Sequence, residues 1–259
     1  MAHPVDGSLP DKGRVEFWDV FADTYTAEQQ GDMPSQIVGW LTDTGIIGAR
    51  KDVLEIGSGP GTYSIPMSHS SKRVSCLDSS GRMLDRLFAS AEDLKIENLE
   101  RIDADLNAFA TERRWDVVVS SLCSGLGGLD SLDRMDSLSK GHCVMISWIV
   151  NDGDGLQSEI WSKLGRDVSY NERSTDDIVE KLESSGRKAE ICEFSDVVKI
   201  EIPLEEAIRR STGTFSVFGL EREARDVTRK ILEPHAIDGI YRFEAVNRIR
   251  VSVWESLDR

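Results

Sequence analysis

Short apolar runs and longer amphipathic stretches alternate along the first 150 residues of the chain. Runs rich in Val, Ile and Leu predict strands, at residues 53–56, 73–78, 99–103, 115–120 and 142–150. Between these runs, apolar residues recur at helical spacing, most clearly over 83–94 and 129–138. Strands that alternate with helices in this way are typical of an α/β fold with a parallel sheet.

The pattern changes in the second half of the chain. Residues 188–200 and 241–254 predict two further strands, and the second of them alternates between two faces. Segments 151–186 and 203–240 combine turn-forming residues with helical spacing, which predicts helical inserts. We therefore expect an α/β fold with a doubly wound, seven-stranded, mostly parallel sheet, an antiparallel last strand and helices on both faces.

Three glycines at alternate positions, Gly57, Gly59 and Gly61, follow the first predicted strand. Without a Cβ at these positions, a ligand can lie against bare backbone, and the helix expected from Thr62 directs its first N–H groups toward that ligand. The spacing differs from the G-x-G-x-x-G of dinucleotide-binding proteins. The preceding Glu55 would repel a pyrophosphate but suits a cationic ligand that carries an amino group.

Acidic residues stand at the tips of the next two predicted strands. Asp78 follows the glycines by about twenty residues, where a doubly wound fold places the carboxylate that binds two ribose hydroxyls. The alternative for Asp78 is a helix N-cap for the segment that starts near Ser80. Asp103 ends the third strand and is followed by Ala104 and Asp105.

The order of these motifs over residues 53–150 resembles that of class I S-adenosylmethionine-dependent methyltransferases. The resemblance implies S-adenosyl-L-methionine as the cofactor and S-adenosyl-L-homocysteine as the product. It also implies methyl transfer to a small-molecule acceptor by in-line displacement, driven mainly by positioning. A non-catalytic S-adenosylmethionine-binding protein and a same-fold transferase acting on a macromolecule are the alternatives.

The resemblance assigns roles to individual residues. Asp103, or Asp105 as a substitute, reaches the adenine amino group, and Tyr25 either touches the methionine carboxylate or only docks its helix on the sheet. Glu55 either lies near the positively charged end of the cofactor or orders the loop. The expected cofactor-binding residues are Tyr25, Glu55, Gly57, Ser58, Gly59, Gly61, Asp78, Ser79, Met83, Asp103, Ala104 and Ser121.

Catalytic residues are less defined than cofactor-binding ones. The segment 121–125 follows the fourth strand, where the family often keeps substrate-orienting groups, and the candidates are Cys123 and Tyr25. Cys123 is either a substrate contact or reactive thiol, or a small residue where backbone approaches the ligand. The chain lacks the Asn/Asp-Pro-Pro-aromatic tetrapeptide of many amino methyltransferases that act on nucleic acid or protein. The need for a general base depends on the acceptor.

Two amphipathic stretches, 15–29 and 33–41, precede the first strand and predict a pair of helices. We expect one domain, because no repeat or long linker interrupts the chain. Its expected parts are a flexible tail (1–13) followed by a methyltransferase-like domain (14–259), with a helical cap (14–50), a cofactor-binding core (51–150) and a C-terminal half whose inserts form a substrate lid (151–259).

Charge and composition narrow the range of partners. The 259 residues carry 31 Lys and Arg against 46 Asp and Glu, a net charge of −15, which argues against nucleic acid or an anionic membrane as a partner. This acidity fits either simple solubility or a saline environment. The four cysteines and four histidines lack metal-ligand spacing, and no apolar run of about eighteen residues predicts a membrane span. We expect a cytoplasmic protein without a metal, and the oligomeric state stays open.

Overall fold

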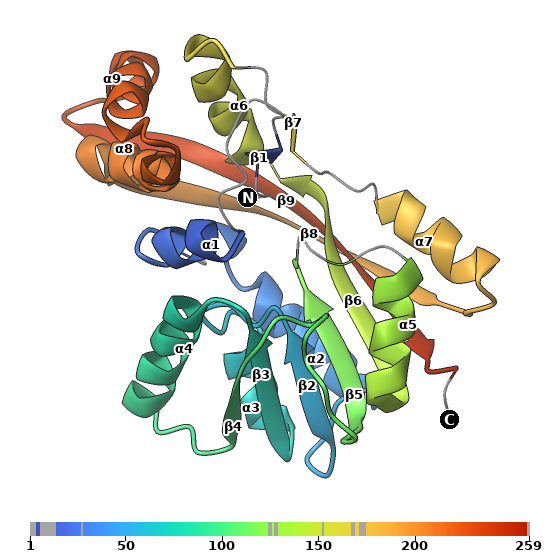
Figure 1. Ribbon diagram of the computed structural model, residues 1–259. Coiled ribbons are helices and arrows are strands. Elements are labelled where there is room, and N and C mark those ends of the chain that lie inside the picture. Colours follow the sequence, from blue (N-terminus) through green and yellow to red (C-terminus); the bar gives the residue numbers. More distant parts are fainter. Residues whose placement is uncertain are drawn as a thin grey trace. The chain divides into compact units, whose positions relative to one another are not determined.

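The computed structural model describes residues 4–5, 14–26, 28–123, 126, 129–151, 153–166, 169–170 and 175–257 (Figure 1). The described residues pack into two compact units. The core unit comprises Asp32–Ile149, Arg173–Ser195 and Arg248–Arg259, and the helical unit comprises Met1–Gly31, Val150–Glu172 and Asp196–Asn247. These boundaries differ from the expected division at residues 50 and 150, and the number of domains stays a prediction.

Seven strands form one sheet in the order β4-β3-β2-β5-β6-β9-β8. Their bounds are Asp52–Ile56 (β2), Arg73–Asp78 (β3), Leu99–Asp103 (β4), Trp115–Ser121 (β5), Ser139–Asn151 (β6), Glu190–Pro203 (β8) and Ile240–Glu255 (β9). The pairs β2–β3, β3–β4, β2–β5 and β5–β6 are all parallel. The predicted seven-stranded, mostly parallel sheet with an antiparallel last strand is confirmed.

Alternating side chains of β2 supply both faces of the sheet in the core unit. Val53 joins one apolar cluster, whereas Leu54 and Ile56 join the other. The helices that contribute to the first cluster are α2 (Met33–Asp43), α3 (Ser64–Ser70) and α4 (Gly81–Asp93). Those that contribute to the second are α5 (Leu129–Leu138) and α7 (Thr175–Ser184), with α5 alongside β6 (Figure 1). Helices therefore cover both faces of the sheet, and the loops lie at the ends of the strands.

The helical unit is built mainly from helices. Its elements are β1 (Pro4–Val5), α1 (Arg14–Ala22), η1 (Glu28–Gln30), α6 (Gly153–Lys163), β7 (Ser169–Tyr170), α8 (Leu204–Thr212), η2 (Gly213–Phe218), α9 (Glu221–Leu232) and η3 (Glu233–His235). Trp161 packs on Phe215 with ring centroids 4.4 Å apart. An added Cβ at Gly213, the first residue of η2, would lie 2.8 Å from Thr24 Cγ2, so the segment just after α1 approaches η2 closely there.

The N-terminal segment differs from its prediction in one respect. The helix expected over 15–29 ends at Ala22, and a separate 3-10 turn begins at Glu28. The Thr26 hydroxyl accepts a hydrogen bond from the Glu28 N–H at 3.2 Å, which favours a new start over continuation. Of the expected tail, residues 4–5 pair antiparallel with β7, and the rest lies outside the described residues. No helix in the described part of the chain has the length and apolar character needed to cross a membrane.

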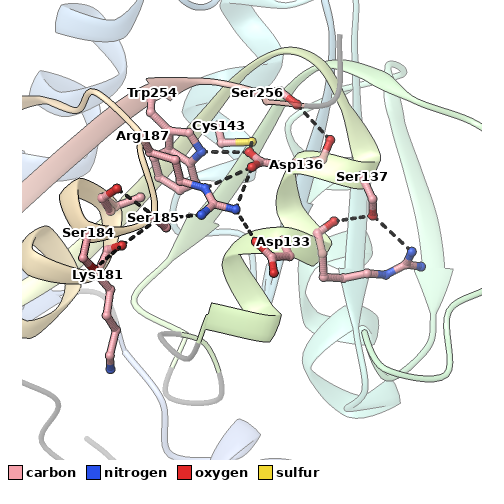
Figure 2. Close-up of polar contacts among 12 residues, drawn as sticks. Asp133, Asp136, Ser137, Cys143, Lys181, Ser184, Ser185, Arg187, Trp254 and Ser256 are labelled. Atoms are coloured by element: carbon pink, nitrogen blue, oxygen red, sulfur yellow. Dashed lines mark hydrogen bonds and ion pairs between the residues drawn. The ribbon is translucent and has the colours of Figure 1, made fainter.

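A buried polar cluster lies where α5 leads into β6 (Figure 2). The Asp136 carboxylate accepts hydrogen bonds from Arg187 Nε at 3.0 Å and from Trp254 Nε1 at 2.9 Å. Arg187 also pairs with Asp133, and the Ser256 hydroxyl donates to the Asp136 carbonyl oxygen at 3.0 Å. This cluster ties α5 to the segment before β8 and to the end of β9.

Candidate functional site

The glycine loop follows β2 and is anchored to the neighbouring strand. The N–H groups of Gly57 and Ser58 both donate to the Leu77 carbonyl oxygen, at 2.8 Å and 3.2 Å. Gly57, Gly59 and Gly61 have φ values of +72°, +51° and +93°, in the left-handed region that favours glycine. The sequence prediction of a tight, glycine-dependent turn at this position is confirmed.

The three glycines face different surroundings. An added Cβ at Gly61 would lie 2.2 Å from Leu87 Cδ1, and one at Gly57 would lie 2.8 Å from Cys123 Sγ. A Cβ at Gly59 would meet no heavy atom of the described structure within 4 Å. Gly57 and Gly61 are therefore required by packing within the protein, whereas the backbone of Gly59 is open to a ligand.

Asp78 ends β3 beside this loop. One carboxylate oxygen accepts a hydrogen bond from the Gly59 N–H at 2.8 Å, and the other accepts one from the Ser80 N–H at 2.8 Å. The N-cap of α4 is Ser80, whose hydroxyl accepts from the Met83 N–H at 3.2 Å, so the alternative role of Asp78 as that cap is wrong. A carboxylate oxygen has two lone pairs and can accept more than one hydrogen bond.

Glu55 lies beneath the loop and is fully buried. Its two carboxyl oxygens accept hydrogen bonds from the Ser64 hydroxyl at the start of α3 and the Ser121 hydroxyl at the end of β5. The Cys76 thiol donates in turn to Ser64 Oγ at 3.4 Å. Burial raises the pKa of Glu55 from 4.5 to about 7, the two hydroxyls oppose this shift, and the Asp78 charge adds to it. Glu55 thus joins β2, α3 and β5 next to the glycine loop, and its role toward the cofactor stays a prediction.

Asp103, at the tip of β4, is paired with Arg101, a cation that the sequence pattern did not single out. Arg101 donates to both oxygens of Asp103, at 2.7 Å and 2.8 Å, and also to Asp85 at 2.7 Å. The pairing with Arg101 lowers the pKa of Asp103. Arg101 and Asp103 are two residues apart on one strand and hence share a face, a signal that strand periodicity could have supplied. Asp105 lies beyond the strand and accepts a bond from the Asn107 N–H at 2.9 Å.

The remaining predicted residues of the core unit lie around these groups. The Ala104 N–H donates to the Asp78 carbonyl oxygen at 3.1 Å, and Ser79 is half-buried beside it. Met83 is buried in α4. The buried Ser58 hydroxyl has no hydrogen-bond partner within the described residues, which marks it as an atom that a ligand can satisfy.

The two catalytic candidates have different settings. Cys123 packs against Gly57 and follows Leu122, whose φ of +51° is unusual for a branched side chain. Ser124 and Gly125 of the same segment lie outside the described residues. Tyr25 belongs to the helical unit, where its ring packs edge-on against Phe21 at 5.5 Å and its hydroxyl accepts from Gln30 at 3.3 Å. Both assigned roles stay predictions.

Taken together, the core unit has several polar groups on or next to the glycine loop. Open backbone at Gly59, a buried hydroxyl at Ser58 and a fixed carboxylate at Asp78 fit a ligand with vicinal ribose hydroxyls. Within the described residues, no group of three or more His, Cys, Asp or Glu side chains could hold a metal ion.

The sheet order with a glycine loop after β2 and acids at the tips of β3 and β4 defines the fold of class I methyltransferases. Residues 53–139 match the family model described as "Methyltransferase domain". These residues are therefore similar to a methyltransferase domain, in agreement with the resemblance of the sequence motifs to the class I family.

Curated relatives and solved structures extend this result. "Ribosomal RNA small subunit methyltransferase G" of Vibrio vulnificus is 26% identical over 113 residues, which are 42% of this chain and 54% of that protein. The chain thus spans about half the length of the curated relatives it matches.

Among solved structures, a putative methyltransferase of Bacillus halodurans aligns with a TM-score of 0.55 and 13% identity, covering 85% of this chain and 99% of that one. Magnesium protoporphyrin IX methyltransferase of Synechocystis, solved with bound SAH, aligns with a TM-score of 0.52 and 14% identity, covering 92% of each chain. At these identities the structural likeness shows the fold alone.

Proposed function

We propose that this chain is an S-adenosylmethionine-dependent methyltransferase that acts on a small molecule. The observation that carries the proposal is the Asp78 carboxylate, held by the N–H groups of Gly59 and Ser80 beside the open backbone of the glycine loop. The match of residues 53–139 to a methyltransferase domain supports it.

The cofactor would be held by groups of the core unit. The Asp78 carboxylate would accept the ribose hydroxyls, and the Ser58 hydroxyl and the backbone of Gly57–Gly61 would contact the ribose and methionine portions. The backbone of Ala104 meets the adenine ring. The adenine amino group would be bound by Asp103, whose two oxygens also accept from Arg101, or by Asp105 as a substitute.

When bound, the cofactor supplies an electrophilic methyl carbon on a sulfonium centre. The contribution of the chain is then to align the acceptor with that carbon and to exclude water, and positioning of this kind can contribute about 7–11 kcal/mol. Glu55 keeps the loop in place through Ser64 and Ser121. The packing of Cys123 against Gly57 favours its role as a small residue at a close approach over that of a reactive thiol.

A small-molecule acceptor is favoured over RNA by the charge of the chain. The curated relatives are named for ribosomal RNA, but this chain has a net charge of −15. In the helical unit, Arg209 and Arg210 both pair with Glu206, and Arg229 pairs with Glu205. Arginines neutralised in this way contribute little to a phosphate-binding surface, which needs clustered, available cations.

The first experiment is isothermal titration of the protein with S-adenosylhomocysteine, with nicotinamide adenine dinucleotide as the control ligand. We expect micromolar affinity for the former and no measurable heat from the latter. Absence of S-adenosylhomocysteine binding would overturn the proposed cofactor. Transfer of labelled methyl groups to a metabolite extract, compared with transfer to ribosomal RNA, then distinguishes the two acceptor classes.

A further inference from the structure

Glu55 has an environment that its role in the loop alone does not require. The side chain is fully buried, yet its two oxygens are bonded to neutral serine hydroxyls, and no cation among the described residues forms a salt bridge with it. An ionised carboxylate in such a place is costly, because two hydroxyls only partly replace its lost hydration.

The groups that face Glu55 come from each element packed against β2. The Cys76 thiol lies opposite it on β3, and the Asp78 carboxylate stands at the tip of the same strand. The Ser121 hydroxyl faces it from β5, and the Ser64 hydroxyl faces it from α3. Burial also raises the pKa of the Cys76 thiol, to about 12, so this group stays neutral near pH 7. Asp78 therefore supplies the neighbouring charge, and that charge is negative.

We propose that Glu55 is a positioning residue that releases its proton when a ligand bearing an ammonium group binds at the glycine loop. The inference rests on the proposed function, which supplies such a ligand. The O–H bond of the Glu55 carboxyl breaks, its proton passes to the buffer, and the carboxylate that remains is balanced by the positive charge of the ligand. Both serine hydroxyls then donate charge-assisted hydrogen bonds to the carboxylate, which tightens the link between β2, α3 and β5.

The linkage predicts how affinity changes with pH. With a pKa raised to about 7, Glu55 is mostly protonated at pH 6 and loses its proton as the pH rises through neutrality. Binding of S-adenosylhomocysteine therefore releases up to one proton at pH 6, and its affinity rises severalfold from pH 6 to pH 7. The ligand's own α-ammonium stays mostly protonated in this range, because the ordinary pKa of an α-amino group is about 7.7–8.0.

Titration calorimetry of the wild-type protein in two buffers of different ionisation enthalpy measures the released proton directly. The ligands are S-adenosylhomocysteine and 5′-methylthioadenosine, which shares the nucleoside but has no ammonium group. We expect proton release with the first ligand and none with the second. Binding of S-adenosylhomocysteine without proton release, or equal release with both ligands, would overturn the inference while leaving the proposed function intact. Binding of neither ligand would overturn the proposed function.

A matched pair of variants assigns the proton to its residue. Glu55→Gln keeps the shape and the contacts with serine but cannot ionise, so we expect binding without proton release and with nearly pH-independent affinity between pH 6 and pH 7. Glu112→Gln makes the same chemical change at an exposed position and should keep the wild-type release. Undiminished release by Glu55→Gln would overturn the assignment. The two-ligand comparison on wild-type protein remains decisive if that variant does not fold.

Discussion

Two buried carboxylates of the core unit are balanced in opposite ways. Asp136 has a side chain only 2% exposed and forms an ion pair with the equally buried Arg187 at 2.8 Å, with the Trp254 indole as a second donor (Figure 2). Glu55 is fully buried and is bonded to the hydroxyls of Ser64 and Ser121. The first acid has its counter-charge within the protein, whereas we propose that the second takes its counter-charge from the ligand.

The positions of the two acids relative to the sheet agree with this difference. Asp136 lies just before β6 begins, and Trp254 lies near the end of β9. Glu55 lies near the end of β2, next to the glycine loop. In open α/β sheets, ligands bind beyond the carboxyl ends of the parallel strands. Asp136, at the amino ends of the strands, stabilises the fold, whereas Glu55, at the carboxyl ends where ligands bind, can respond to binding.

The largest expected effect on stability follows from removing Arg187, the cation beside Asp136. Although burial opposes its charge, Asp133 and Asp136 together raise the pKa of Arg187. Arg187→Met leaves Asp136 buried without that partner and should lower the free energy of unfolding by about 3–5 kcal/mol. Urea denaturation at pH 7 measures this change.

Asp133 provides the matched control for this substitution. It also pairs with Arg187, but its side chain is 68% exposed, so Asp133→Asn should cost less than about 1 kcal/mol. Similar losses of stability in the two variants would mean that the buried Asp136–Arg187 pair stabilises the fold no more than the exposed Asp133 contact does.

The next effect concerns the pH dependence of stability. The pKa of Glu55 rises from 4.5 to about 7 on folding, so the folded state holds a proton that the unfolded state has lost between these values. The stability contributed by neutral Glu55 is present below pH 4.5 and is lost as the pH rises to about 7. The loss amounts to roughly 3 kcal/mol, from about 1.4 kcal/mol per pKa unit.

Glu55→Gln does not undergo this titration. Urea unfolding of both proteins from pH 4.5 to pH 8 should therefore show wild type losing stability relative to the variant as the pH rises. A constant difference between the two proteins across this range would contradict the raised pKa of Glu55.

The features that could be predicted from the sequence are those that depend on local patterns of residues. The strands, the glycine loop and the acids at positions 78 and 103 each depend on a few adjacent residues, and a parallel sheet brings such strand tips together. The partners of the buried acids depend instead on contacts between distant residues. Ser121 is 66 residues from Glu55, and Arg187 is 51 residues from Asp136. Periodicity places these residues on an element but does not say which polar groups meet.

A smaller effect comes from the acid that lies between the loop and α4. Asp78→Asn should weaken binding of S-adenosylhomocysteine by more than tenfold, about 1.4 kcal/mol, because the ribose hydroxyls lose a charged acceptor. Since the Asp78 charge also raises the pKa of Glu55, the same variant should lower the pH at which Glu55 titrates. Calorimetry and pH-dependent unfolding measure the two effects. Asp93→Asn, an exposed acid at the end of α4, is the control and should change neither.

The smallest effect separates the two hydroxyls that bind Glu55. Both lower its pKa, and the Ser121 hydroxyl does so more than the Ser64 hydroxyl. Ser121→Ala should therefore move the titration of Glu55 to higher pH by more than Ser64→Ala does, and each should cost about 1 kcal/mol for the lost hydrogen bond. Carbon-13 NMR of the Glu55 carboxyl carbon follows the midpoint directly. A midpoint that stays in place or falls in both variants would mean that the hydroxyls do not stabilise the carboxylate. The difference between Glu55 and Asp136, whose charge is balanced by Arg187, would then have to be attributed to burial alone.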